Sequence, residues 1–488
     1  MNKIASLIFG CMLSGQVVAA EYDGLMHFPS IFSGSVEQIK LPESEKMGLL
    51  GTKYLVDIAP NLYLGGAVYG AFTGARGGFF TIGPEFAWQQ KLYRNLEWST
   101  GLYAGAGGGG GATALVGGGL MLRPHIDLMW NFGGHRVGIS ASKVHFPSGK
   151  INSNQIGLVY AADTEFLQLD PLYFGGQVMY EQRTGIGFDK IQAVVGKYQG
   201  EIFGRSGLRR SIGLVGFRME HLWTTTSAWG IEAAGAASGR AAGYAEFLGT
   251  VSAEAPILDR HAAIGIRAGA GMGGGGAVSV GGGRLFKLGG YFTADFSRDF
   301  HASLEAGYVS APGGQLRARY TTANLTMDLD HLDAIPGYRQ IDQYSMLLGA
   351  IKYTGITQAD GSKQQVEAIA LKVNRHFNDI IYLSGQAHSA FHGTAGGYSA
   401  GFIGAGVQTP ELPSEISLGA EVLLGAAGGG GIASGSGATY APNVFLEWHL
   451  DNLLSMRLAA GRIKSARGSF DSQTVDLSLK YSYETSRR

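Results

Sequence analysis

Cysteine is nearly absent from this sequence, since Cys11 is the only one among 488 residues. A chain with one cysteine cannot form an internal disulfide, which excludes the small, disulfide-rich class of exported proteins. Charge is also scarce: 16% of the residues are charged, against ~25% in ordinary soluble domains. The 38 Lys and Arg balance 38 Asp and Glu and are scattered, so no nucleic-acid-binding surface is indicated.

The sequence also lacks a run that would make a transmembrane helix. The best candidate, Gly101 to Leu122, contains 22 residues and no charge, which is long enough to span a bilayer. Ten of the 22 are glycine, however, and each costs roughly 0.8–1 kcal/mol relative to alanine inside a helix. With helices excluded, a closed β-barrel is the other structure that satisfies backbone groups within lipid.

Alternating polar and apolar residues are present instead, and they predict strands. In Val475 to Tyr483 every odd position is apolar or aromatic and every even position is polar. Shorter stretches around Leu371 and Leu325 repeat this pattern. In a transmembrane barrel the polar face lines the lumen and the apolar face meets lipid. The candidate lumen-facing residues are Asp476, Ser478, Lys480, Lys372, Asn374, Asn324, Asp328, Gln386 and His388.

Glycine is abundant, with 79 residues, and its runs recur with a period near 160 residues. The runs begin at Gly107, Gly273 and Gly428, and each precedes a second glycine cluster and an apolar strand. This register predicts three internal repeats. Glycine inside a strand indicates a bend or a close approach of backbones. The candidate structural glycines are Gly108, Gly109, Gly110, Gly274, Gly275, Gly429 and Gly430.

The first 20 residues have the features of a secretory signal peptide. Lys3 is followed by an apolar stretch, and Val18-Ala19-Ala20 forms a small-residue cleavage site. Residues 21–45, with Pro29 and Pro42, are expected to be an irregular tail or plug, and residues 46–488 the barrel. The repeats are expected at about 46–184, 209–357 and 364–485.

The strand count predicts an all-β protein with an antiparallel transmembrane β-barrel of about 22–24 strands. A single wide barrel is favoured over three tandem barrels for two reasons. The third repeat ends one strand short of an eight-stranded unit, and Asp360-Gly361 offers a hairpin turn across the second boundary. A soluble or fibrous β-protein is the remaining alternative.

Candidate catalytic residues are weak. His145 and Ser148 loosely resemble the His and Ser pairing of outer-membrane lipid A deacylases, but Pro147 is inserted and the other repeats lack the histidine. His388 and Ser389 are adjacent on a strand and therefore point to opposite faces. No catalytic, metal or cofactor site is predicted, so the chain is not expected to be an enzyme.

The signal sequence and the alternating strands, the last of which contains Tyr481 and Tyr483, resemble Gram-negative outer-membrane β-barrel proteins as a class. That resemblance implies an outer-membrane location with membrane lipid as a partner. It also implies a pore or an export or uptake channel. Two alternatives stay open: a structural or partner-docking protein that uses glycine-rich surfaces to bind a protein or to self-assemble, and a lipid-modifying barrel enzyme.

Overall fold

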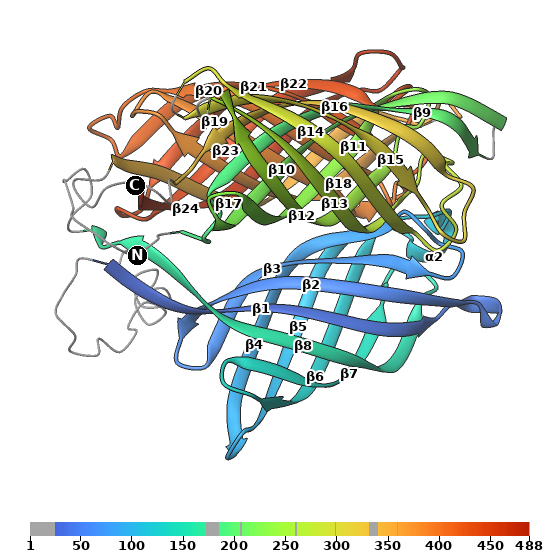
Figure 1. Ribbon diagram of the computed structural model, residues 1–488, viewed down its shortest axis with the longest axis horizontal. Helices are drawn as coiled ribbons and strands as arrows, with labels where there is room; N and C mark the ends of the chain where they lie inside the picture. The colour runs from blue at the N-terminus through green and yellow to red at the C-terminus, as the bar shows by residue number, and fades with distance from the viewer. Residues whose placement is uncertain are drawn as a thin grey trace.

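The computed structural model of the protein describes residues 25–171, 185–204, 207–258, 261–297, 299–330, 340–358 and 360–487. Within these ranges the chain forms 24 strands, all paired antiparallel, and the strands close into three barrels of eight (Figure 1). Two short helical turns, η1 (Pro42–Ser44) and α2 (Thr113–Val116), interrupt them. Among the described residues, no helix is both long and apolar enough to cross a membrane.

The strands follow one another in sequence around each barrel. The first barrel contains β1 (Leu25–Lys40), β2 (Lys46–Ala59), β3 (Leu62–Thr73), β4 (Phe79–Tyr93), β5 (Leu96–Gly109), β6 (Leu120–Asn131), β7 (His135–His145) and β8 (Asn152–Leu169). The second contains β9 (Lys190–Gly204), β10 (Gly207–Thr224), β11 (Ser227–Ser238), β12 (Ala245–Ile257), β13 (Ala262–Gly274), β14 (Arg284–Asp295), β15 (Phe300–Ser310) and β16 (Arg317–Asp328). The third contains β17 (Gln340–Thr357), β18 (Lys363–His376), β19 (Ile381–Gly393), β20 (Ser399–Gln408), β21 (Ile416–Gly428), β22 (Ala438–His449), β23 (Leu454–Ser465) and β24 (Asp471–Arg487).

Each barrel closes because its first strand pairs with its last. In register, Ser35 of β1 lies opposite Val159 of β8, and Leu348 of β17 lies opposite Leu479 of β24. In the second barrel β9 pairs with both β10 and β16. The prediction of an all-β protein with about 22–24 antiparallel strands is confirmed, but the prediction that they form a single wide barrel is wrong.

The error came from the position of the repeat boundaries. The expected second repeat, 209–357, includes residues 345–354, but these belong to β17 and begin the third barrel, which is therefore complete. The turn at Asp360-Gly361 joins β17 to β18 within that barrel. The barrels are instead connected by the segments that follow Leu169 and Asp328.

The N-terminal part of the prediction also needs correction. Residues 25–40 of the expected tail or plug form β1, a full strand of the first barrel. Pro29 lies in β1 opposite Glu165 of β8, and Pro42 starts the turn η1. Proline indicates irregular structure in a sequence, but it is also tolerated at a strand edge or in a turn, and these two prolines lie in such places. The expected signal peptide lies outside the described residues.

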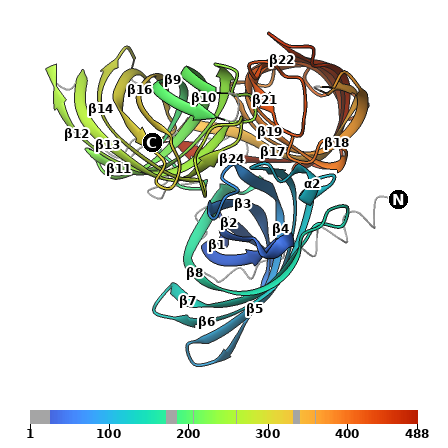
Figure 2. The same cartoon turned by 90° about the vertical axis from the view of Figure 1, so that its right-hand side faces the viewer.

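The two ends of the molecule differ. Connections from odd to even strands lie at one end, here called the loop end, and include the glycine runs between β5 and β6, β13 and β14, and β21 and β22. Connections from even to odd strands lie at the opposite end, here called the turn end, where β1 begins and β24 finishes. Figure 2, which looks along the long axis, shows the three barrels side by side around a common centre.

The interior of each barrel has an apolar layer toward the loop end. In the second barrel it is formed by side chains such as Ile202, Ile212, Leu285 and Leu316, all fully buried. Corresponding clusters surround Phe79 and Met121 in the first barrel and form similarly in the third. An eight-stranded barrel is just narrow enough for side chains to fill it. These layers therefore plug the lumens.

Candidate functional site: the barrel interiors and the cavity between them

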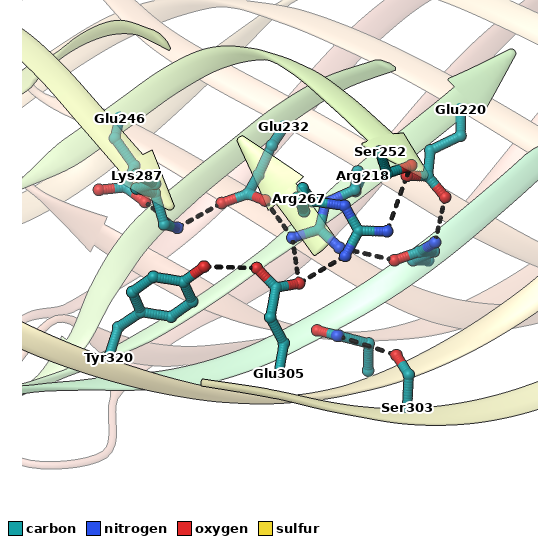
Figure 3. Close-up of polar contacts among 12 residues, drawn as sticks. Arg218, Glu220, Glu232, Glu246, Ser252, Arg267, Lys287, Ser303, Glu305 and Tyr320 are labelled. Atoms are coloured by element: carbon teal, nitrogen blue, oxygen red, sulfur yellow. Dashed lines mark hydrogen bonds and ion pairs between the residues drawn. The ribbon is translucent and has the colours of Figure 1, made fainter. Parts of the chain in front are cut away.

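Charged side chains fill the second barrel on the turn-end side of its apolar layer (Figure 3). Arg218 on β10 donates from Nε and Nη2 to Glu232 Oε2, at 2.8 and 2.5 Å. Lys287 Nζ lies 2.6 Å from Glu232 Oε1 and 3.1 Å from Glu246 Oε1. Arg267 joins Glu305 at 2.5 Å. These charges come from different strands, so the network ties the barrel wall together across its lumen.

The first barrel has a comparable network. Arg123 donates from Nε and Nη2 to the two carboxylate oxygens of Glu37, at 2.9 and 3.0 Å. Its Nη1 donates to Tyr69 Oη at 3.2 Å, and that hydroxyl donates to Glu85 at 3.0 Å. Lys53 completes the chain at 2.5 Å from Glu85. A bidentate arginine–carboxylate pair is among the stronger charge-assisted contacts in proteins.

The third barrel holds most of the candidate lumen-facing residues, and the structure places them in its buried interior. Lys372 Nζ lies 2.9 Å from Asp476 Oδ1, to which Ser478 also donates at 2.6 Å. Lys480 pairs with Glu447 at 2.5 Å. The remaining members, Asn374, Gln386 and His388, are also buried there.

Two candidates, Asn324 and Asp328, belong to the second barrel. Asn324 donates to Ser303 at 3.0 Å, and Asp328 contacts His301 at 2.8 Å. The nine candidates therefore do not share one lumen. Partners such as Arg218 and Glu232 were missed, although the alternation that identified Lys372 applies equally to them: Phe217 and Met219 flank Arg218.

The weak catalytic signals lead to no catalytic arrangement among the described residues. Ser148 accepts the N–H of Gly118 at 2.9 Å in the turn after β7. His388 contacts Tyr353 Oη at 2.8 Å, whereas Ser389 contacts Ser399 at 2.9 Å. No group of three or more His, Cys, Asp or Glu suited to a metal ion occurs in the described part of the chain.

The outer surfaces of the barrels are apolar. On β24, Leu477 and Leu479 are 52% and 41% exposed, while their neighbours Asp476 and Ser478 are buried. Leu325 on β16 is 51% exposed beside the buried Asn324. Soluble proteins bury apolar side chains and expose charge. Here the order is reversed, as in barrels that have lipid outside and polar groups inside.

The glycine runs hold the three barrels together at the loop end. A Cβ built on Gly274 would lie 2.7 Å from the backbone N of Gly78 in the first barrel. The equivalent distances are 2.3 Å from Gly428 to Gly243 and 3.0 Å from Gly108 to Gly397. Each run thus touches the next barrel, and the three contacts close a ring.

The neighbouring candidate glycines contact their own barrel. A Cβ on Gly109, Gly275 or Gly429 would lie 2.1–2.3 Å from a carbonyl oxygen of the loop between the third and fourth strands. A Cβ on Gly110 or Gly430 would lie 2.3 Å from a carbonyl of that loop. Only glycine permits backbones this close. The same pattern in three barrels indicates approximate threefold symmetry.

A cavity of about 2310 Å³ lies between the barrels. Its walls are outward-facing apolar side chains from all three barrels, among them Val68, Phe80, Val195, Phe217, Ile403 and Leu424. At the loop end it is lined by ring glycines, including Gly78, Gly243 and Gly397. Pockets for small ligands usually measure ~300–1,000 Å³, so this one exceeds that range. Sequence alternation identified the apolar faces but not that they enclose a common space.

The turn end of the cavity has a different lining. Phe166 and Tyr483 bring the first and third barrels together there, with ring centroids 5.3 Å apart. Tyr481 donates to Gln168 across the same contact at 2.8 Å. Arg375 of the third barrel reaches Met327 of the second, with Nη1 2.6 Å from Sδ. Aromatic and charged groups therefore gather at this end.

Comparison with known proteins finds similar solved structures but no matching family. No protein-family model matches the chain, and no curated protein matches it. Similar solved structures include OpdQ of Pseudomonas aeruginosa (TM-score 0.22, 8% identity, 94% of this chain and 98% of that one). They also include OccAB3 of Acinetobacter baumannii (0.22, 8%, 94% and 99%) and a mutant of the ferric enterobactin receptor PfeA of Pseudomonas aeruginosa (0.29, 9%, 93% and 80%). All three matches have TM-scores below 0.3 and identities below 10%, so none of them assigns this chain to a family.

Proposed function

We propose that this chain is an integral outer-membrane protein whose functional compartment is the cavity between its barrels, not the barrel lumens. The reversed polarity supports membrane insertion, because the outward faces suit lipid and not water. The strands, of 10 to 18 residues, are long enough to cross, since ~9–11 tilted residues suffice. Short turns are typical of the periplasmic side, so the turn end is assigned to the periplasm.

The observation that carries this proposal is the contrast between filled lumens and the open space between them. Each lumen holds an apolar layer and a network of paired charges. Among the described residues, no such layer or network fills the central cavity, whose walls are mainly apolar. Ion flow through a barrel would require displacing both layers, whereas an apolar molecule could occupy the cavity without changing a strand.

The geometry favours the structural alternative over a conducting pore. The glycine-rich surfaces do dock, but onto equivalent surfaces of the same chain. The barrels thus form a single-chain assembly, and the ring of contacts fixes the cavity at its loop end. In this proposal the barrels serve as walls that enclose a hydrophobic compartment.

The first test is the membrane position of the barrel surface. Two single-cysteine variants are made in a Cys11→Ser background. One replaces Ile156, which is 74% exposed on β8, and the other replaces Lys150 in the exposed loop before β8. We expect a water-soluble maleimide to label Lys150→Cys in intact cells and to spare Ile156→Cys, which a membrane-soluble maleimide labels. Equal labelling of both by the water-soluble reagent would contradict membrane insertion.

The second test is conductance. The purified protein in a planar bilayer is expected to show no stepwise ion conductance, with a wide trimeric porin as the positive control. Steady conductance in the range of that porin would overturn the assignment of the lumens as filled.

A further inference from the structure

We propose that the cavity binds a zwitterionic phospholipid, with its acyl chains against the apolar walls and its headgroup beside Arg375 at the turn end. The inference rests on the proposed function, because it names the occupant of the compartment described above.

The walls select acyl chains. Leu348, Ile403, Val422 and Leu424 of the third barrel line the cavity and are 41–60% exposed. They belong to the outward face that meets lipid elsewhere on the barrels. Apolar cavities are poorly hydrated, and even one of ~150 Å³ stays dry and takes up apolar molecules. A space more than ten times larger within a membrane is therefore expected to be filled by the apolar material around it, the chains of membrane lipid.

The two ends orient the lipid. At the loop end, the cavity is lined by the glycines of the ring, such as Gly78, Gly243 and Gly397, which carry no charge. At the turn end, tyrosine side chains such as Tyr344 and Tyr481 line it. Tyrosine is enriched at the level of lipid headgroups, where one end is apolar and the other polar. The acyl chains thus point to the glycine ring and the headgroup to the periplasmic side.

Arg375 supplies a cation for the phosphate. Alternation along β18 places Asn374 in the buried interior of the barrel and Arg375 on the opposite face, where it lines the cavity. Its side chain is buried, 9% exposed, and Nη2 pairs with Asp342 at 3.1 Å. Its Nε has no hydrogen-bond partner in the described part of the chain. A buried guanidinium with an unused donor, at the headgroup end of an apolar cavity, is suited to a phosphate oxygen.

Carboxylates at the same end favour a headgroup that also carries a positive charge. Asp57, Asp189 and Asp330 line the turn end of the cavity. Their negative charge disfavours a purely anionic headgroup or the several phosphates of lipid A, and the half-buried Asp57 is placed to attract an ammonium group. A phospholipid with a phosphate and a primary ammonium, as in phosphatidylethanolamine, matches both signs of charge.

The experiment measures retained lipid by native mass spectrometry on the full-length protein purified in mild detergent. The Gly66→Leu/Gly401→Leu double variant fills the cavity from two barrels, because a Cβ at either position meets nothing within 4 Å and both glycines line the cavity. Gly355→Leu is the control, since its Cβ also meets nothing within 4 Å but Gly355 does not line the cavity. We expect the wild type and the control to retain phosphatidylethanolamine and the double variant to lose most of it.

The second arm concerns the headgroup. Arg375→Gln is expected to weaken phosphatidylethanolamine retention roughly tenfold, the effect of losing one charge-assisted hydrogen bond, and Arg375→Lys to weaken it less. Retention of lipid A by the wild type, equal retention in the double variant, or no retained lipid would each overturn the inference. The conductance and labelling tests distinguish failure of this inference from failure of the proposed function. A membrane-inserted, non-conducting protein that retains no lipid refutes the lipid occupant alone. A conducting protein refutes the proposed function.

Discussion

The barrel interiors and the cavity between the barrels are lined by the same strands and have opposite chemistry. On β10, Arg218 points into the lumen while Phe217 lines the cavity. On β24, Ser478 and Leu479 divide in the same way. Side chains close the eight-stranded lumen because it is narrow. The space between three barrels is too wide to be closed by the same side chains, so the difference shows how one alternating pattern produces both a plug and a compartment.

The largest expected effect tests the lumen side of this comparison. Arg218→Met should destabilise the protein by about 3–5 kcal/mol, because it leaves Glu232 and Glu305 buried with one cation fewer. The Arg218→Met/Glu232→Met double variant should lose less than the single variant, since paired charges can be replaced by apolar groups of similar size. Urea-dependent loss of the compact band in gel electrophoresis measures both.

The matched control for that experiment is a pair on the surface. Arg462 and Asp471 are joined at 2.7 Å but are 62% and 31% exposed, so Arg462→Met should leave unfolding unchanged. If Arg218→Met and Arg462→Met behaved alike, the interior network would not be holding the barrel together.

A second prediction tests whether the cavity is as apolar as the outer surface. Val422 on β21 lines the cavity, and Val444 on the adjacent strand β22 faces away from it; they are 57% and 61% exposed. Arginine at either position should cost roughly 2–4 kcal/mol, the value for the lipid face of a barrel near the bilayer midplane. Unfolding of both variants in lipid vesicles measures the costs. A large cost for Val444→Arg with none for Val422→Arg would show that the cavity contains water.

Much of this architecture follows from local sequence pattern. Alternation places Asp476 and Leu477 on opposite faces because the side-chain period of a strand is two, and no distant contact is needed to set it. The glycine runs likewise indicated close backbone approach, since few other arrangements accommodate several consecutive glycines. Strand type, total strand count and the repeats of glycine could therefore be predicted from residues a few positions apart.

Barrel closure could not be predicted in this way. It depends on pairing between β17 and β24, whose partners are more than 100 residues apart in sequence. Misplacing residues 345–354 by one repeat was enough to favour a single wide barrel. A single wide barrel also implies an open lumen, in which a substitution such as Ser478→Arg would be tolerated. In the observed third barrel, the same substitution places a bulky cation in a filled interior. The cavity depends in turn on how the barrels pack, which no single strand encodes.

The smallest expected effect concerns the ring of glycine contacts that joins the three barrels at the loop end. Gly274→Val and Gly207→Val place a β-branched residue at φ values of 142° and 97°, so both should incur backbone strain of about 1–3 kcal/mol. A Cβ on Gly274 would also lie 2.7 Å from Gly77 and Gly78 of the first barrel, whereas a Cβ on Gly207 meets nothing within 4 Å. Gly274→Val should therefore cost a further ~1–3 kcal/mol through overpacking between barrels. The measurement is urea-dependent unfolding together with trypsin cleavage of the segments that connect the barrels, which should become faster in Gly274→Val alone. Identical unfolding and cleavage of the two variants would mean that the glycine runs are loops without a role in holding the cavity closed at this end.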